Sequence, residues 1–239
     1  MSGKRKAAAL VAEFLGTGAL TLLVLSVQRS QIGLTFFVAL AAGLVVALMN
    51  FAVSGASGGY FNPALTVALW TARKIETLTA FLYVVVQFLG AYGAYWLYTF
   101  YVNNKLTVVG GHFTARIMVA EAVGTAIFGF AVAAAVFKKD LSDGARAAFV
   151  GIGLTVGIVA ASSAAIGLLN PAVALGIRAW VWGTYVLGPV VGALVGVNLY
   201  SMLFAESGAS ASAAVSAPAK VVTAKKKPAA KKKSASKKK

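Results

Sequence analysis

The chain has 239 residues, of which 59% are hydrophobic and 12% are charged, and its formal net charge is +16. Soluble domains carry about 25% charged residues, and the mean hydropathy of +0.83 indicates that lipid solvates much of this chain. With no cysteine and one histidine, the sequence offers no disulfide framework, no thiolate or His/Cys metal site and no nucleophile–base pair, so a membrane-embedded enzyme is disfavoured.

The first predicted element is an apolar run behind Lys4-Arg5-Lys6 that is long enough to cross a hydrocarbon core of about 30 Å. It is too long for the apolar part of a signal peptide, so we expect it to stay in the membrane. In chain order, the predicted spans are 7–28, 32–53, 78–101, 116–137, 147–166 and 182–204.

Two shorter apolar segments, 58–72 and 170–178, remain between these spans, and each contains Asn-Pro. Short, proline-interrupted segments in matching positions are typical of broken helices that line a site at membrane depth. The predicted fold is therefore an all-α membrane protein with six transmembrane helices and two re-entrant half-helices.

The distribution of basic residues orients these spans, because Lys and Arg are enriched in cytoplasmic loops. With both short segments re-entrant and both termini cytoplasmic, the internal charges are Lys4, Arg5, Lys6, Arg73, Lys74, Lys138, Lys139, Arg146 and the tail. The external ones are Arg29, Lys105, Arg116 and Arg178. If the first short segment crossed the membrane instead, Arg73 and Lys74 would move outside and the bias would weaken.

The sequence also contains an internal repeat. Glu13-x-x-Gly-Thr recurs at Glu121, and Asn62-Pro-Ala recurs at Asn170, each 108 residues later. Each half holds three full spans and one half-span, and because three is odd, the second half must be inverted relative to the first. We expect a basic cytoplasmic segment at 1–6, a channel domain at 7–204 with repeats at about 7–102 and 115–204, and a disordered Lys/Ala-rich tail at 205–239.

Asn-Pro by itself is an ordinary helix start, because Asn caps orphan N–H groups and Pro suits the first helical position. Two copies in inverted halves bring two helix N-termini, each with a partial positive charge, together at the midplane. If the oxygens of Asn62 and Asn170 cap their helices, their NH₂ groups can donate to one passing water. That water's hydrogens then point outward, which interrupts a proton wire and predicts proton exclusion.

These motifs resemble those of the aquaporin (major intrinsic protein) family, and the resemblance covers residues 7–204. The stretches that carry it are 57–66, 169–172, 13–17, 121–125, 87–91 and 189–193. The resemblance implies a passive channel for water and small uncharged solutes such as glycerol, urea or ammonia. It also implies one pore per subunit, a homotetramer, and midplane positions at Asn62-Pro63-Ala64 and Asn170-Pro171-Ala172.

Two carboxylates, Glu13 and Glu121, fall inside predicted spans, where ionisable residues are functional by default. A proton-relay or catalytic role is one hypothesis. The family resemblance favours another, in which both glutamates buttress the loops that hold the half-helices.

The outer constriction departs from the family pattern. The arginine that usually follows the second Asn-Pro-Ala is replaced by Val173, and Arg178 lies too far along the helix to substitute for it. Spacing from the motifs assigns the other three positions to Ala42, Ile158 (with Gly157 as the neighbouring alternative) and Gly167. We therefore expect a wide, apolar and uncharged constriction that lets solutes larger than water through.

A secondary transporter is the alternative function, since transporters also use inverted repeats. It would need an ionisable group for ion coupling, and Glu13 and Glu121 are the candidates. For the tail, a cytoplasmic position favours anionic lipid or no specific partner, and its Lys/Ala/Pro composition leaves nucleic acid as another possibility.

Overall fold

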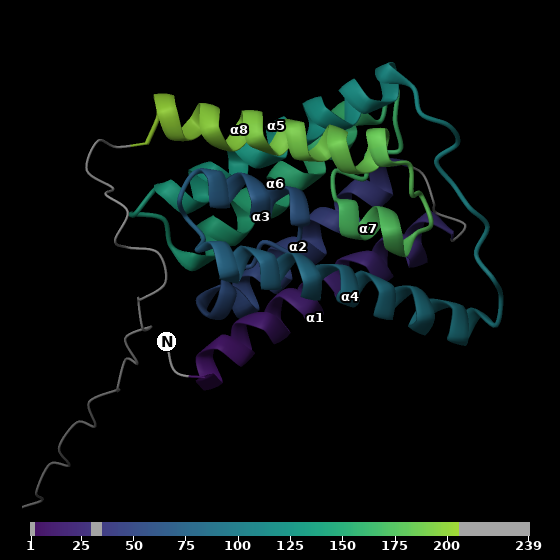
Figure 1. The fold of residues 1–239 in the computed structure, drawn as a ribbon, viewed down its shortest axis with the longest axis horizontal. Helices are drawn as coiled ribbons and strands as arrows, with labels where there is room; N and C mark the ends of the chain where they lie inside the picture. Colours follow the sequence, from purple (N-terminus) through teal and green to yellow (C-terminus); the bar gives the residue numbers. More distant parts are fainter. Residues whose placement is uncertain (1–2, 30–34, 206–239) are drawn as a thin grey trace, which may run out of the picture.

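The computed structural model describes residues 3–29 and 35–205; the predicted tail lies almost entirely outside this part. Within it, six elements are long and apolar enough to cross a membrane. They are α1 (Gly3–Gln28), α2 (Thr35–Ser57), α4 (Thr77–Val102), α5 (Ala115–Phe137), α6 (Asp143–Ala161) and the span Trp182–Leu203, which consists of a π-helical segment (Trp182–Leu187) and α8 (Gly188–Leu203). Two short helices, α3 (Pro63–Thr71) and α7 (Pro171–Gly176), lie between them (Figure 1).

The surface and the interior of the bundle differ as lipid solvation requires. Large apolar side chains point outward, among them Leu48, Phe81 and Val195, which are 65%, 64% and 55% exposed. Small residues occupy the helix contacts, where they let backbones approach closely. A Cβ added at Gly192 would lie 2.0 Å from the carbonyl oxygen of Ala122, so α8 meets α5 with almost no space between the backbones.

Several helix bounds differ from the hydropathy prediction. The largest difference is at α6, predicted at 147–166 and found at Asp143–Ala161. The Ser142 hydroxyl accepts from the N–H of Ala145 and starts the helix one turn earlier, through polar residues that hydropathy excludes. The prediction for the second span, 32–53, was also shifted, because α2 continues through Ser54 to Ser57. Lys4 to Lys6 form the first turn of α1 rather than a separate segment.

The two halves interlock through their short helices. The half-helix α3 of the first repeat packs mainly against α8 of the second, and α7 of the second repeat packs against α4 and α1 of the first. In Figure 1, α7 lies between α4 and α8 near the middle of the bundle. Each half-helix is thus enclosed by the other repeat, and neither half can bury its own half-helix alone.

Basic residues gather at opposite ends of the bundle in two groups. At one end, the Lys74 Nζ lies 4.0 Å from the centroid of the Phe137 ring, and burial together with the charge of Lys139 lowers the pKa of Lys74. At the other end, Arg29 donates to the carbonyl of Thr107 and Arg178 to that of Leu106. This matches the division into two sides that the sequence predicts.

Candidate functional site

The two Asn-Pro-Ala motifs meet inside the bundle. The Asn62 Nδ2 donates to the carbonyl of Leu169 at 2.8 Å, and the Asn170 Nδ2 donates to the carbonyl of Phe61 at 2.9 Å. Each asparagine therefore bonds to the residue that precedes the other asparagine. Both side chains are buried, at 1% exposure, so a pair separated by 108 residues in sequence forms one reciprocal junction.

Each asparagine also caps its own half-helix. The Asn62 Oδ1 accepts from the N–H of Ala64 at 2.9 Å, and the Asn170 Oδ1 accepts from those of Ala172 and Val173 at 3.0 and 3.4 Å. Proline follows at the first helical position in both cases. From the sequence, the NH₂ group of each asparagine was expected to be free to donate to water. Here one hydrogen of each NH₂ is committed to the opposite loop, and one remains.

The residues before the two asparagines share an uncommon backbone conformation. Phe61 and Leu169 have φ of +51° and +53°, in the left-handed region that bulky residues rarely adopt. This conformation turns each carbonyl towards the opposite asparagine. Apart from the 108-residue repeat, no sequence pattern predicts this conformation, because neither Phe nor Leu is typical of left-handed backbone.

Glu13 holds the first loop in place. Its Oε1 accepts from the Ser57 hydroxyl at 2.7 Å and the N–H of Tyr60 at 3.0 Å, and its Oε2 accepts from the N–H of Phe61 at 2.7 Å and the Gln87 Nε2 at 2.8 Å. All lone pairs of this fully buried carboxylate are used. Gln87 also donates to Thr66 of α3, so it joins the glutamate to the half-helix.

Glu121 performs the equivalent task in the second repeat. Its Oε1 accepts from the N–H groups of Gly167 and Leu168 at 2.9 and 3.1 Å, and its Oε2 accepts from that of Leu169 at 2.8 Å. The bonds Glu13–Phe61 and Glu121–Leu169 both span 48 residues. Both carboxylates are thus engaged with loop backbone, as the buttressing hypothesis expects; Glu13 accepts four hydrogen bonds and Glu121 three.

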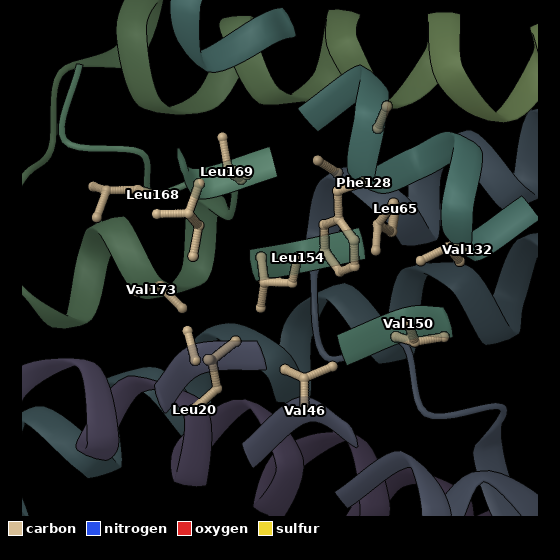
Figure 2. Packing of buried hydrophobic residues seen from close by; sticks show 14 of the residues in the cluster. Leu20, Val46, Leu65, Phe128, Val132, Val150, Leu154, Leu168, Leu169 and Val173 are labelled. Carbon is tan, nitrogen blue, oxygen red and sulfur yellow. The ribbon is translucent and has the colours of Figure 1, made fainter. Parts of the chain in front are cut away.

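The four residues assigned to the outer constriction line one cavity, in which about 70 Å³ is open to the centre of a water-sized molecule. Among the residues that the structure describes, none lining this cavity is charged. Figure 2 shows Leu20, Leu154 and Val173 pointing towards one another from three different helices. The assigned residues are Ala42, Ile158, Gly167 and Val173.

The choice between Ile158 and Gly157 follows from their contacts. Ile158 lines the cavity, and a Cβ at Gly167 would lie 3.1 Å from its Cγ2. Gly157 instead faces α5, since a Cβ there would lie 2.5 Å from the carbonyl oxygen of Gly124. Gly157 is therefore a helix-packing residue.

A second, smaller cavity shares no lining residue with the first and has about 20 Å³ open to the centre of a water-sized molecule. Leu65, Val132 and Val150 converge on it from α3, α5 and α6 (Figure 2). Its lining also includes Asn50 and Arg146. Neither residue was predicted from the sequence to belong to a site.

The family model for "Major intrinsic protein" matches residues 2–200. The chain belongs to this family. Aquaporin Z of Photorhabdus laumondii is 29% identical over 82% of this chain and 97% of its own length. Glycerol uptake facilitator protein-like 6 of Lactiplantibacillus plantarum is 30% identical over 77% of this chain and 93% of its own length.

Among solved structures, the aquaglyceroporin from Plasmodium falciparum matches with a TM-score of 0.70 and 19% identity, over 83% of this chain and 96% of that one, which establishes the shared fold. Membership of the major intrinsic protein family and six apolar spanning helices make the chain an integral, multi-pass membrane channel rather than an enzyme. The predicted fold class is confirmed.

Proposed function

We propose that this major intrinsic protein conducts water and small neutral solutes passively, along a path from the outer cavity past Asn62 and Asn170 to the inner cavity. The reciprocal hydrogen bonds of these two asparagines carry the proposal. They fix two amide groups side by side between two cavities that can each hold at least one water, which needs about 10–15 Å³.

Proton exclusion follows from the same junction. Each capped asparagine keeps one N–H, and a water that accepts from both must turn its own hydrogens away along the path. The N-termini of α3 and α7 add partial positive charge at this point. Together they oppose a continuous proton wire and the passage of cations.

The permeants include solutes larger than water. The side chains of Ala42, Gly167 and Val173 are small and uncharged. The outer cavity therefore excludes few small solutes by their size. An apolar wall still slows polar solutes, because each hydrogen bond to water that is not replaced costs about 1–3 kcal/mol. The two relatives, an aquaporin and a protein similar to glycerol uptake facilitators, agree with this range of permeants.

Passive conduction is favoured over secondary transport. A coupled transporter needs an ionisable group that can bind and release an ion near the midplane. The two intramembrane candidates, Glu13 and Glu121, instead accept four and three hydrogen bonds, most of them from the backbone of the loops. Net uptake against a gradient would support the transporter.

Stopped-flow light scattering on proteoliposomes tests the proposal. We expect water, glycerol and urea permeabilities above those of protein-free vesicles, with proton permeability at the lipid background. Vesicles that conduct water but neither glycerol nor urea would contradict the wide outer constriction. A proton flux that rises with the water flux would contradict the role of the asparagine junction.

We further propose that both termini are cytoplasmic and that the chain forms a homotetramer with one pore per subunit. The tail supplies ten of the 22 Lys and Arg residues, and we propose that it binds anionic lipid, with nucleic acid as the alternative. Deleting residues 206–239 should abolish binding to anionic vesicles and leave the flux per channel unchanged. Loss of DNA binding alone would favour nucleic acid.

A further inference from the structure

The inner cavity contains a fixed amide from α2. Asn50 is 2% exposed, and its Nδ2 donates to the carbonyls of Gly58 and Gly59 at 3.3 and 3.1 Å. Two carbonyl acceptors assign the nitrogen to this side, so the Oδ1 faces away from the loop. Gly59, with φ of +69°, permits the close approach, because a Cβ there would lie 2.6 Å from the Asn50 Nδ2.

The Oδ1 of Asn50 is buried and has no hydrogen-bond partner in the part of the chain that the structure describes. A buried acceptor without a partner is unfavourable, and native proteins pair nearly all such atoms with protein, water or ligand. Since Asn50 lines the cavity, a molecule held there is the candidate for this partner.

Arg146, in the first turn of α6, supplies the opposite kind of group. Its Nη2 reaches the carbonyls of Lys138 and Leu141 at 3.5 and 3.4 Å, which are long contacts. Over the described residues, neither its Nε nor its Nη1 has a partner, and no carboxylate forms an ion pair with it. The guanidinium is half-buried in the cavity wall with donors to spare.

The two cavities differ in volume and in charge, although Gln28 and Thr35 give the outer one polar groups as well. The outer cavity is larger, at about 70 Å³, and no described residue in its lining is charged. The inner one, at about 20 Å³, is smaller and holds a permanent positive charge. A narrow pore segment with a fixed charge discriminates between solutes more strongly than a wide, uncharged segment.

We propose that Asn50 and Arg146 form a solute-binding site at the inner mouth, which selects small neutral molecules that carry a hydrogen-bond acceptor next to a donor. The proposal rests on the channel function proposed above. An amide such as urea carries both kinds of group: its carbonyl can accept from the guanidinium, and its N–H can donate to the Asn50 Oδ1. The same charge repels cations, so the charge that Val173 does not provide is supplied at the other cavity.

The test compares the ratio of urea to water permeability in proteoliposomes. Arg146→Met keeps the length of the side chain but removes the hydrogen-bond donors. We expect the ratio of urea to water permeability to fall about fivefold or more, because urea then gives up hydrogen bonds to water that no protein group replaces. Water permeability should stay within about twofold, because water makes the fewest contacts. Arg146→Lys, which keeps a donor and the charge, should retain most of the wild-type ratio.

Lys139→Met is the matched control, since it removes the same charge from an exposed residue at the same end, outside the cavity lining. An unchanged ratio in Arg146→Met, or an equal shift in Lys139→Met, would overturn the proposal. If wild-type vesicles conduct nothing above empty ones, the channel function fails as well. If wild-type vesicles conduct but the ratio of urea to water permeability is the same in Arg146→Met, only this inference fails.

A second variant covers the case in which Arg146→Met does not fold. Val136 lines the same cavity, and the wild-type chain has no cysteine, so Val136→Cys places a single thiol at the site. Modification with a small methanethiosulfonate before reconstitution should reduce urea flux more than water flux, with Lys139→Cys as control. Equal flux before and after complete modification of Val136→Cys would place the cavity off the path and overturn the proposal.

Discussion

Val173 determines the character of the outer cavity, because it is the first residue after the second Asn-Pro-Ala and its side chain points into that cavity (Figure 2). Its neighbours in the cavity, Ala42 and Gly167, are small and uncharged, so they replace neither the bulk nor the charge of an arginine. We expect Val173→Arg to lower glycerol permeability about tenfold and water permeability less, because a long side chain narrows a path that glycerol fills and water does not. Stopped-flow measurements on proteoliposomes check this.

Val173→Met is the control, because it adds length without charge. If Met lowers glycerol flux as much as Arg does, bulk alone explains the effect. A glycerol-to-water ratio that is unchanged in Val173→Arg would show that the narrowest point lies elsewhere.

Glu121 holds the loop before the second half-helix in place. Its two oxygens accept three backbone N–H groups, those of Gly167, Leu168 and Leu169. Glu121→Gln replaces one oxygen with a donor, so at least one buried N–H loses its partner at a cost of about 1–3 kcal/mol. We expect a lower melting temperature in detergent and a lower water flux per channel. Glu76→Gln, at an exposed position, should change neither.

Much of the site at the residue scale could be predicted from sequence, because duplication marks it. The repeat offset of 108 residues identified Asn62, Asn170 and both glutamates without structural information. It gave no indication of Gln87, which has no counterpart at that offset, because the residue 108 positions later is Val195. Asn50 was missed for another reason: a single amide in an apolar helix has no pattern, and its importance depends on the loop beside it.

Close packing between helices is the property that the glycines control. The contact of α8 with α5 depends on Gly192, where a Cβ would lie 2.0 Å from a backbone oxygen that cannot move independently. We expect Gly192→Ala to destabilise the protein by about 1–3 kcal/mol, because overpacking a helix contact forces backbone shifts. Thermal unfolding in detergent, followed by circular dichroism, measures the change.

Gly55→Ala is the matched control for this prediction. Gly55 also lies inside a helix, α2, but nothing lies within 4 Å of an added Cβ. Because Ala favours helix over Gly by about 1 kcal/mol, this variant should be neutral or slightly stabilised. If both variants behave alike, the α5–α8 contact is looser than the structure indicates.

Helix existence was predictable from the sequence, and helix ends were less so. Hydropathy located all six spans and both short segments, since lipid imposes apolar runs. It misplaced α6, because the helix starts at a Ser142 cap among polar residues and ends at Ala161, before the loop that leads to Asn170. The π-helical segment Trp182–Leu187 before Pro189 was also not predicted; hydropathy treats it as ordinary span.

At the scale of the whole molecule, the interlocked repeats form a single unit. Since α3 packs on α8 and α7 packs on α4, the asparagine junction forms only when both halves are in place. Two hydrogen bonds form this junction, with one donor from each repeat. Asn62 donates to the carbonyl of Leu169, and Asn170 donates to the carbonyl of Phe61. Expressing the two halves as separate chains should therefore give no conduction unless they associate.

The orientation of the whole molecule is the last prediction. Lys74 and Lys139 lie together at one end, and Arg29 and Arg178 at the other. The first end holds more Lys and Arg, which the positive-inside rule places in the cytoplasm. The absence of cysteine allows a direct test with single-cysteine variants. A membrane-impermeant maleimide should label His112→Cys in intact cells and Lys139→Cys only after permeabilisation, whereas the wild-type chain stays unlabelled. Labelling of Lys139→Cys in intact cells, with His112→Cys protected, would establish the opposite orientation.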